Sequence, residues 1–449
     1  MKILLVYPPF CTPASPPYSL TNLHSFLKNN STAEIVTLDL NIQFHNLKFP
    51  SFKEYFQSDW RDLKCYSIKS KEYCQLSAQA YSENNKKVLA GTKPEYFAEL
   101  LEKIKIEKPD IVAFSFVYSS QAFYGLALLK ELNITTVIGG PCINDKLKKM
   151  ADHHFANEVE FLHFIQDKCN LVKTSMNDLN IKYSLDYSIY PLNKYFVPKI
   201  VLPLKTSSTC YYKQCAFCNH YSNVSYFEYD LELIKKTITN SQCKHFFLID
   251  DMIPAGRLLK LADLFKQLNI KWACQLKPST FSDSVMKTLY DSGLRIVIWG
   301  AESGNQRILD LMKKGTKLEE IRSTLKNSHA AGIKNVVYIM FGFPTETEEE
   351  FKDTISFLKD NAENIDLISE STFGLQKGTP IYNNPDAFGI TKIEETKRTI
   401  LEPKIEFESK GLSRSEIVAL KKKFKQDLEK INKYPRNMNF FREHMLTVN

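Results

Sequence analysis

Three cysteines lie within nine residues of the segment "TCYYKQCAFCNHY", at Cys210, Cys215 and Cys218. Thiolates bind zinc and iron–sulfur clusters, but a closed tetrahedral zinc site takes four ligands and this segment supplies only three cysteines. A cubane 4Fe–4S cluster held by three thiolates leaves one iron without a protein ligand. A small chelating molecule can bind that iron, so the spacing favours a cluster with an open coordination position.

A zinc site is the alternative, because His220 follows Cys218 closely and could supply a fourth ligand. The protein would then be a non-catalytic zinc-binding interaction protein whose metal only shapes a loop. Zinc knuckles usually stand in small modules, whereas this motif follows the first strand of a long α/β series. Its position favours the cluster and leaves zinc as the second possibility.

The composition limits the class of protein. A chain of 449 residues exceeds the usual size of one core, so we expect two domains. With 59 basic and 51 acidic residues, the net charge of +8 indicates no nucleic-acid partner. Ten cysteines are too sparse for a disulfide scaffold, and "MKILLVYPPF" is β-like, so we expect a cytoplasmic protein. The absence of an apolar run of 18 residues predicts no membrane partner.

The N-terminal part alternates strands and helices. Near-continuous apolar runs of this length are typical of parallel strands buried on both faces. They predict an α/β, doubly wound, Rossmann-like domain over residues 1–169, with a helical insertion at about 42–107. The four predicted strands are Lys2–Pro9, Ala33–Asn41, Asp110–Val117 and Ile134–Pro141.

A second alternating series follows a linker at residues 170–197. Six β/α units in a row predict a partial TIM-like barrel over 198–410, with its chemistry at the carboxyl ends of the strands. Residues 411–449 are predicted to be a helical C-terminal segment. The predicted barrel strands are Lys199–Ser207, His245–Asp251, Ile270–Lys277, Arg295–Ser303, Asn335–Pro344 and Asp366–Leu375.

Helix boundaries in the barrel region are also readable. Ser282 is a predicted N-cap, and Gly293 a predicted helix stop. Thr347 and Glu350 fit a capping box. These signals support the alternation of strands and helices.

The cysteine loop directly follows the first barrel strand, and this arrangement resembles the radical S-adenosylmethionine (SAM) enzymes over Lys199–Leu375. That family carries the motif Cys-x₃-Cys-x₂-Cys, whereas four residues separate Cys210 from Cys215 here. Similar variants with the pattern Cys-Tyr-x-x-x-Cys-x-Phe-Cys resemble a peptide-modifying branch of the family. The resemblance implies a 4Fe–4S cluster on the three cysteines, SAM on its open iron, and an electron donor such as flavodoxin or ferredoxin. No cysteine follows Cys274, so one cluster is expected.

The same resemblance implies a set of SAM contacts but no assigned catalytic residue. Glu302 lies in "WGAESGNQRILDLMKKG", where a carboxylate at a strand end is costly without a partner. For Asp250 and Asp251 the alternative is a role in a turn or as a helix cap. Lys277 ends the third strand together with Gln275, and a structural role is its alternative. The candidate contacts are Phe217 near the adenine, Asp250 and Asp251 near the amino end, Gln275, Glu302 and Ser303 near the ribose, and Gly342, Phe343 and Pro344 in "MFGFPTET".

The N-terminal domain resembles the cobalamin-binding-type domain that precedes such barrels, through "YPPF…PPYSLTNLHSFL" and "VIGGP". The Asp-x-His-x-x-Gly loop of that domain type is absent. His24 lies at helical spacing with Leu20 and Leu27 and is predicted to pack in a helix. The domain either binds cobalamin at the carboxyl ends of its strands or keeps the fold as a docking surface.

The resulting expectation is a radical SAM enzyme that cleaves SAM reductively and modifies a peptide or natural-product precursor, as in the maturation of ribosomally made peptides. With cobalamin, the expected reaction is C-methylation, which makes the protein a transferase. Without cobalamin, hydrogen abstraction leads to epimerisation, cross-linking or rearrangement.

Overall fold

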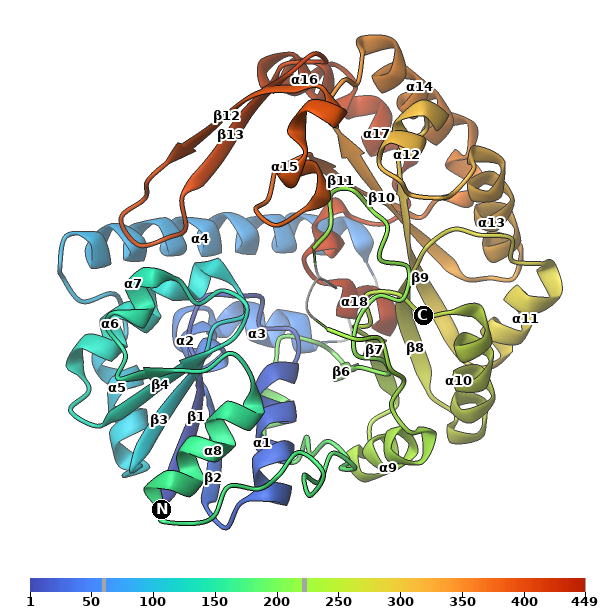
Figure 1. Ribbon diagram of the computed structural model, residues 1–449. Coiled ribbons are helices and arrows are strands. Elements are labelled where there is room, and N and C mark those ends of the chain that lie inside the picture. Colours follow the sequence, from blue (N-terminus) through green and yellow to red (C-terminus); the bar gives the residue numbers. More distant parts are fainter. Residues whose placement is uncertain (59–61, 220–223, 449) are drawn as a thin grey trace.

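The computed structural model describes residues 1–58, 62–219 and 224–448. It contains a five-stranded parallel sheet of order β2-β1-β3-β4-β5 and a six-stranded parallel sheet of order β11-β10-β9-β8-β7-β6. The two sheets occupy different halves of the molecule (Figure 1). This arrangement agrees with the predicted Rossmann-like domain followed by a partial barrel.

The five-stranded sheet has β3 as its middle strand, with β1 and β4 on either side of it. Residues Ile3–Val6 are fully buried, as a continuous apolar run predicts for a central parallel strand. The fifth strand was not predicted, because two residues are too short to carry a pattern. The strands are β1 (Lys2–Tyr7), β2 (Glu34–Asp39), β3 (Ile111–Ser115), β4 (Thr135–Gly139) and β5 (His153–His154).

Helices cover this sheet, and the predicted insertion between β2 and β3 is helical. Its aromatic side chains connect distant parts of the chain: Tyr66 Oη lies 2.9 Å from Nδ1 of the buried His444. The insertion contains α2 (Leu40–Lys48), α3 (Pro50–Gln57), α4 (Leu63–Leu89) and α5 (Phe97–Ile106). The other helices are α1 (Tyr18–Asn30), η1 (Ser119–Gln121), α6 (Ala122–Glu131), α7 (Asp145–Lys148) and α8 (Glu158–Lys168).

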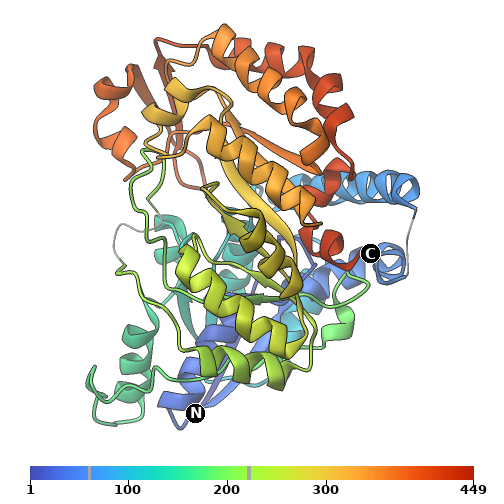
Figure 2. The same ribbon diagram turned by 90° about the vertical axis from the view of Figure 1, so that its right-hand side faces the viewer.

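The six barrel strands follow one another in sequence order, and their helices cover the outer face of the sheet (Figure 2). The short helix η2 (Leu192–Lys194) precedes them. The strands are β6 (Leu202–Leu204), β7 (His245–Leu248), β8 (Lys271–Leu276), β9 (Leu294–Glu302), β10 (Lys334–Phe341) and β11 (Leu367–Thr372). The helices are α9 (Leu231–Ser241), α10 (Ala255–Leu268), α11 (Asp283–Asp291), α12 (Gln306–Leu311), α13 (Leu318–Ala330), α14 (Glu348–Asp360) and η3 (Ala362–Asn364).

The predicted helix signals are confirmed. The Ser282 side chain accepts a hydrogen bond from the Val285 amide at the start of α11. Gly293 has φ +99°, and a Cβ there would approach the Ile270 carbonyl oxygen to 1.9 Å, so this turn requires glycine. Thr347 and Glu350 form the capping box of α14.

The C-terminal part is helical as predicted, but an antiparallel hairpin of β12 (Ile390–Thr396) and β13 (Lys404–Ser409) precedes it. The hairpin was missed because its charged residues hide the strand pattern. Helix α18 (Arg442–Thr447) contacts β7, β8 and β9 and lies at the open side of the barrel (Figure 1). The remaining elements are α15 (Pro380–Asn383), η4 (Pro385–Phe388), α16 (Arg414–Lys423), α17 (Lys425–Ile431) and η5 (Arg436–Asn439).

None of the helices built by the described residues combines the length and the apolar character needed to cross a bilayer.

Candidate active site and interdomain cavity

The cysteine loop begins directly after β6, and Asp250 holds its first residues. The Asp250 carboxylate accepts hydrogen bonds from the Thr206 amide at 2.9 Å and from Ser207 Oγ at 2.7 Å. Burial raises the pKa of Asp250, and these hydrogen bonds oppose that shift. Asp250 therefore supports the loop, in line with the turn alternative, while a SAM contact by Asp250 or the half-buried Asp251 stays a prediction.

Backbone hydrogen bonds fix the cysteine loop against the segment that follows α12. The Ala216 amide donates to the Met312 carbonyl oxygen at 2.9 Å, and Tyr212 Oη donates to the Lys313 carbonyl oxygen at 2.9 Å. On its other side, the loop accepts a bond from the Ile381 amide to the Ala216 carbonyl oxygen at 3.0 Å. The protein thus positions the loop through its own contacts.

The three thiols are half-buried and close enough to influence one another. Burial raises the pKa of the Cys215 thiol; the Lys314 ammonium opposes this shift, and charge on Cys218 and Cys210 adds to it. Among the described residues, no three His, Cys, Asp or Glu side chains converge on one point as they would around a single metal ion. His220, the fourth ligand of the zinc alternative, lies outside the described residues.

A donor set of three thiols fits a 4Fe–4S cubane better than it fits a single ion. Each thiolate of a cubane binds a different iron, so the three sulfur atoms need not converge on one centre. The neighbouring Lys314 ammonium suits the negative charge of such a cluster. Cys210, Cys215 and Cys218 are therefore the residues that would hold it.

Lys314 and Glu302 form a buried ion pair beside this loop, with Nζ and Oε1 2.9 Å apart and side chains 8% and 11% exposed. Burial alone would lower the pKa of Lys314, but the Glu302 carboxylate and the charges on Cys215 and Cys210 together outweigh it, and the pKa lies above its ordinary value. Lys314 Nζ also lies 5.9 Å from the ring centre of Phe217. Sequence reasoning missed Lys314, although the strand-end carboxylate of Glu302 signalled that a partner was needed.

The other predicted contacts divide into two groups. Gln275 is half-buried at the end of β8, and the Lys277 ammonium lies 3.9 Å from the Tyr212 ring centre, close to the cysteine loop. Ser303 instead faces the helix layer, because its Oγ lies 3.3 Å from Thr354 Oγ1 of α14.

The loop after β10 is engaged in packing. Gly342 has φ +76° and donates its amide to Glu346 Oε2 at 2.5 Å. Phe343 is buried with its ring centre 5.1 Å from that of Phe373, and Pro344 is buried beside it. Their SAM contacts stay predictions, as do those of Phe217, Gln275, Glu302 and Ser303.

A cavity of about 1,130 Å³ lies between the two halves of the molecule. It exceeds the roughly 300–1,000 Å³ of common small-molecule pockets. Its walls come from the carboxyl ends of β1, β3 and β4, from alternate residues of β6 and β7, and from the chain before and within α18. Residues from these three walls include Cys11, Ser115 and Tyr118; Pro203, Lys205 and Phe247; and Phe440, Arg442 and Glu443.

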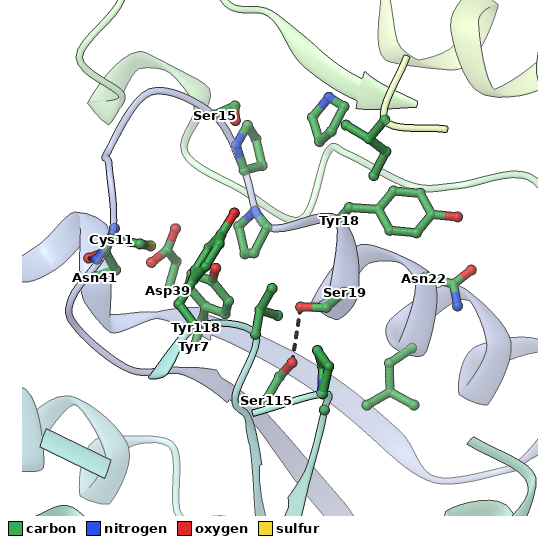
Figure 3. Close-up of a pocket in the computed structure, with 18 of the residues that line it drawn as sticks. Tyr7, Cys11, Ser15, Tyr18, Ser19, Asn22, Asp39, Asn41, Ser115 and Tyr118 are labelled. Atoms are coloured by element: carbon green, nitrogen blue, oxygen red, sulfur yellow. Dashed lines mark hydrogen bonds between the residues drawn. The ribbon is translucent and has the colours of Figure 1, made fainter. Parts of the chain in front are cut away.

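Hydroxyl and amide groups lie among apolar side chains on the N-terminal wall (Figure 3). Ser115 Oγ donates to Ser19 Oγ at 3.0 Å, and the Asn41 side chain accepts from the Cys11 amide at 2.8 Å. Burial raises the pKa of Asp39 to about 6. Burial also raises the pKa of Cys11, so this thiol stays neutral in the cavity wall, a place that sequence reasoning did not foresee.

His24 is not among the residues that line the cavity. It is 4% exposed on α1, as the prediction of a packed helix residue requires.

The Radical SAM superfamily profile matches residues 204–358. The chain is 23% identical over 331 residues to an uncharacterized methyltransferase of Pyrococcus horikoshii, covering 63% of this chain and 72% of that protein. It is 32% identical over 107 residues to the ribosomal protein uS12 methylthiotransferase RimO of Caldicellulosiruptor saccharolyticus, and spans only 24% of that protein.

Two solved structures are similar in fold. The radical SAM methyltransferase TsrM of Kitasatospora setae, with tryptophan substrate and a SAM analogue bound, has a TM-score of 0.63 at 14% identity, covering 96% of this chain and 89% of that one. The cobalamin-dependent radical SAM enzyme OxsB has a TM-score of 0.63 at 13% identity, covering 99% and 70%. At these identities the likeness concerns the fold.

The matched segment contains the cysteine loop together with β7, β8, β9 and β10. It therefore includes both the thiols and the strands whose carboxyl ends surround them. The family uses a 4Fe–4S cluster and SAM, as the resemblance implied. The chain therefore contains a radical SAM domain at residues 204–358.

Proposed function

We propose that this enzyme is a cobalamin-dependent methyltransferase that methylates a carbon atom of its substrate. The observation that carries the proposal is the 1,130 Å³ cavity, which joins the carboxyl ends of the N-terminal sheet to the inner side of β6 and β7. A corrinoid in this cavity would lie beside the barrel that holds the cysteine loop.

The lining of the cavity suits a corrinoid, a large ring that carries many amide side chains. Ser19, Ser115, Tyr118 and Asn41 offer neutral donors and acceptors to such amides. Phe247 and Phe440 add aromatic surface for the ring itself. When bound, the corrinoid would supply a methyl group.

The cysteine loop performs the second part of the chemistry. Cys210, Cys215 and Cys218 would hold the cluster, and the bound cluster supplies the electron that breaks a carbon–sulfur bond of SAM. Tyr212 and the Met312 carbonyl fix the loop before the cluster binds. A flavodoxin or ferredoxin is the proposed electron donor, and three free thiols require the reducing cytoplasm.

The substrate class is part of the proposal. A peptide or another natural-product precursor fits the family branch that the cysteine spacing resembles, and the similar TsrM structure holds tryptophan. The methyltransferase name of the Pyrococcus relative supports methyl transfer as the reaction.

Anaerobic reconstitution with iron, sulfide and hydroxocobalamin tests the proposal. After desalting we expect about four irons per chain and one retained corrinoid, measured by metal analysis and visible absorption. Addition of SAM and dithionite should then yield S-adenosylhomocysteine from methyl transfer out of SAM, and 5'-deoxyadenosine from its reductive cleavage. Iron without corrinoid would remove methyl transfer and leave hydrogen-abstraction chemistry, whereas stoichiometric zinc without iron would contradict the cluster.

A further inference from the structure

Lys314 is buried beside the cysteine loop in a position that the backbone fixes. The two residues before it are tied to the loop through the Met312–Ala216 hydrogen bond and the contact of Tyr212 Oη with the Lys313 carbonyl oxygen. Its side chain is 8% exposed. The backbone that leads into Lys314 is therefore fixed against the loop that carries the thiols.

Glu302 completes the arrangement from the end of β9. Its Oε1 accepts Lys314 Nζ at 2.9 Å, and its backbone adopts φ +69°, a conformation that is uncommon for a residue other than glycine. Gly300 leaves room for the pair, because a Cβ there would lie 2.9 Å from Lys314 Nζ and 3.0 Å from Glu302 Oε1. The local sequence thus accommodates an ion pair at this point of the strand.

The charge of this pair matters for a cluster bound to the loop. Three thiolates make the cluster anionic, and one-electron reduction adds a further negative charge. Lys314 acts electrostatically on both Cys215 and Cys210. In a site of low dielectric, a fixed cation at this range stabilises the reduced cluster more than the oxidised one, and a nearby carboxylate does the opposite.

We propose that Lys314 is the buried counter-charge of the cluster, that Glu302 positions its ammonium, and that the two together set the reduction potential of the cluster. The inference rests on the assignment of a cluster to the three cysteines. It concerns the electron-accepting step, in which the cluster takes one electron from an external reductant. Lys314 is a positioning and tuning residue, because it acts through charge and not through contact with a reacting atom.

Three variants test the proposal with a matched control. Lys314→Met removes the buried charge, Glu302→Gln removes its partner, and Lys313→Met removes the charge of an exposed neighbour at the same loop. Each protein is reconstituted anaerobically, without SAM or corrinoid. The first readout is the iron content. The second is the midpoint potential of the cluster, which electron paramagnetic resonance measures during a mediator titration with dithionite.

We expect full iron content in all proteins, a more negative midpoint in Lys314→Met, and a more positive one in Glu302→Gln. Lys313→Met should stay near the wild-type value, and Lys314→Arg should restore most of the wild-type midpoint.

An unshifted midpoint in Lys314→Met, or a shift equalled by Lys313→Met, would overturn the proposal. If Lys314→Met takes up no iron, the test depends on Glu302→Gln alone. A midpoint potential of Glu302→Gln that is no more positive than that of the wild type would then refute the tuning role. A wild-type protein that binds no iron would contradict the cluster assignment itself, which is a separate outcome.

Discussion

The cysteine loop gathers charged and ionisable groups into a small volume, whereas the N-terminal wall of the interdomain cavity combines hydroxyls and amides with prolines and other apolar side chains around a wide space. The loop is fixed by backbone bonds to the segment after α12. The cavity is shaped by parts of the chain that are far apart in sequence, from β1 to α18. The two regions therefore differ in both chemistry and construction.

This difference matches two ways of holding a cofactor. A compact inorganic cluster is held by a few strong metal–sulfur bonds, so the loss of one ligand has a large effect. A large organic ring is held by many weak contacts, so volume and shape decide its binding. Variants in one region should accordingly leave the cofactor of the other region in place.

The largest effect is expected from Cys215→Ala. Removal of one of three thiolate ligands should reduce the iron content to near zero, while hydroxocobalamin is still retained after desalting. Iron analysis and visible absorption measure both on the same sample. Cys243→Ala is the control, since Cys243 lies outside the loop and should leave both contents unchanged. Loss of corrinoid together with iron would contradict the independence of the two regions.

The reverse result is expected from Ser115→Trp. The indole would occupy space in the cavity next to Ser19, so the corrinoid should be lost on desalting while about four irons remain. Ser115→Ala removes only the hydrogen bond and should retain the corrinoid. If Ser115→Trp binds hydroxocobalamin as well as the wild type does, the corrinoid lies elsewhere.

The sequence predicted the cysteine loop and its strand more completely than it predicted the cavity. The cysteines lie close together in the chain and directly follow the predicted strand Lys199–Ser207, which contains β6, so the local sequence places them at the end of a barrel strand. Helix signals such as Ser282 and the Thr347–Glu350 capping box were correct because they depend on local hydrogen bonds.

The remaining features depend on contacts between distant residues. Lys314, just after α12, pairs with Glu302 at the end of β9. Arg442 and Glu443 line the same cavity as Cys11 only because α18 returns to the open side of the barrel. The hydrophobic periodicity of a sequence does not show which distant residues come together in the fold. It also fails where a strand is two residues long or where charges interrupt its pattern, as in β5 and the β12–β13 hairpin.

Glu346→Gln sharpens the contrast in charge, because Glu346 is fully buried near the barrel mouth and its Oε1 has no hydrogen-bond partner among the described residues. Burial raises its pKa from 4.5 to about 7, so the folded protein keeps a proton that the unfolded chain loses between these pH values. The wild-type free energy of unfolding should therefore fall as pH rises through this window, relative to the variant, by roughly 3 kcal/mol in total.

Melting temperatures of both proteins at pH 4.5 and pH 8 measure this effect. The difference should move in favour of Glu346→Gln at the higher pH, because glutamine can still accept the Gly342 amide without carrying a charge. A constant difference would mean that Glu346 is ionised throughout and has a cation partner, as Glu302 has in Lys314.

The smallest effect is expected from Tyr212→Phe. The variant loses the hydrogen bond from Tyr212 Oη to the Lys313 carbonyl oxygen and keeps the ring beneath the Lys277 ammonium. One such bond contributes about 1 kcal/mol, which is far less than a thiolate ligand, so the iron content should stay near four per chain. Release of iron to an added chelator should become only a few times faster. Because the variant leaves every thiol in place, a loss of iron as complete as that of Cys215→Ala would mean that the fixed position of the loop, and not thiolate ligation alone, holds the cluster.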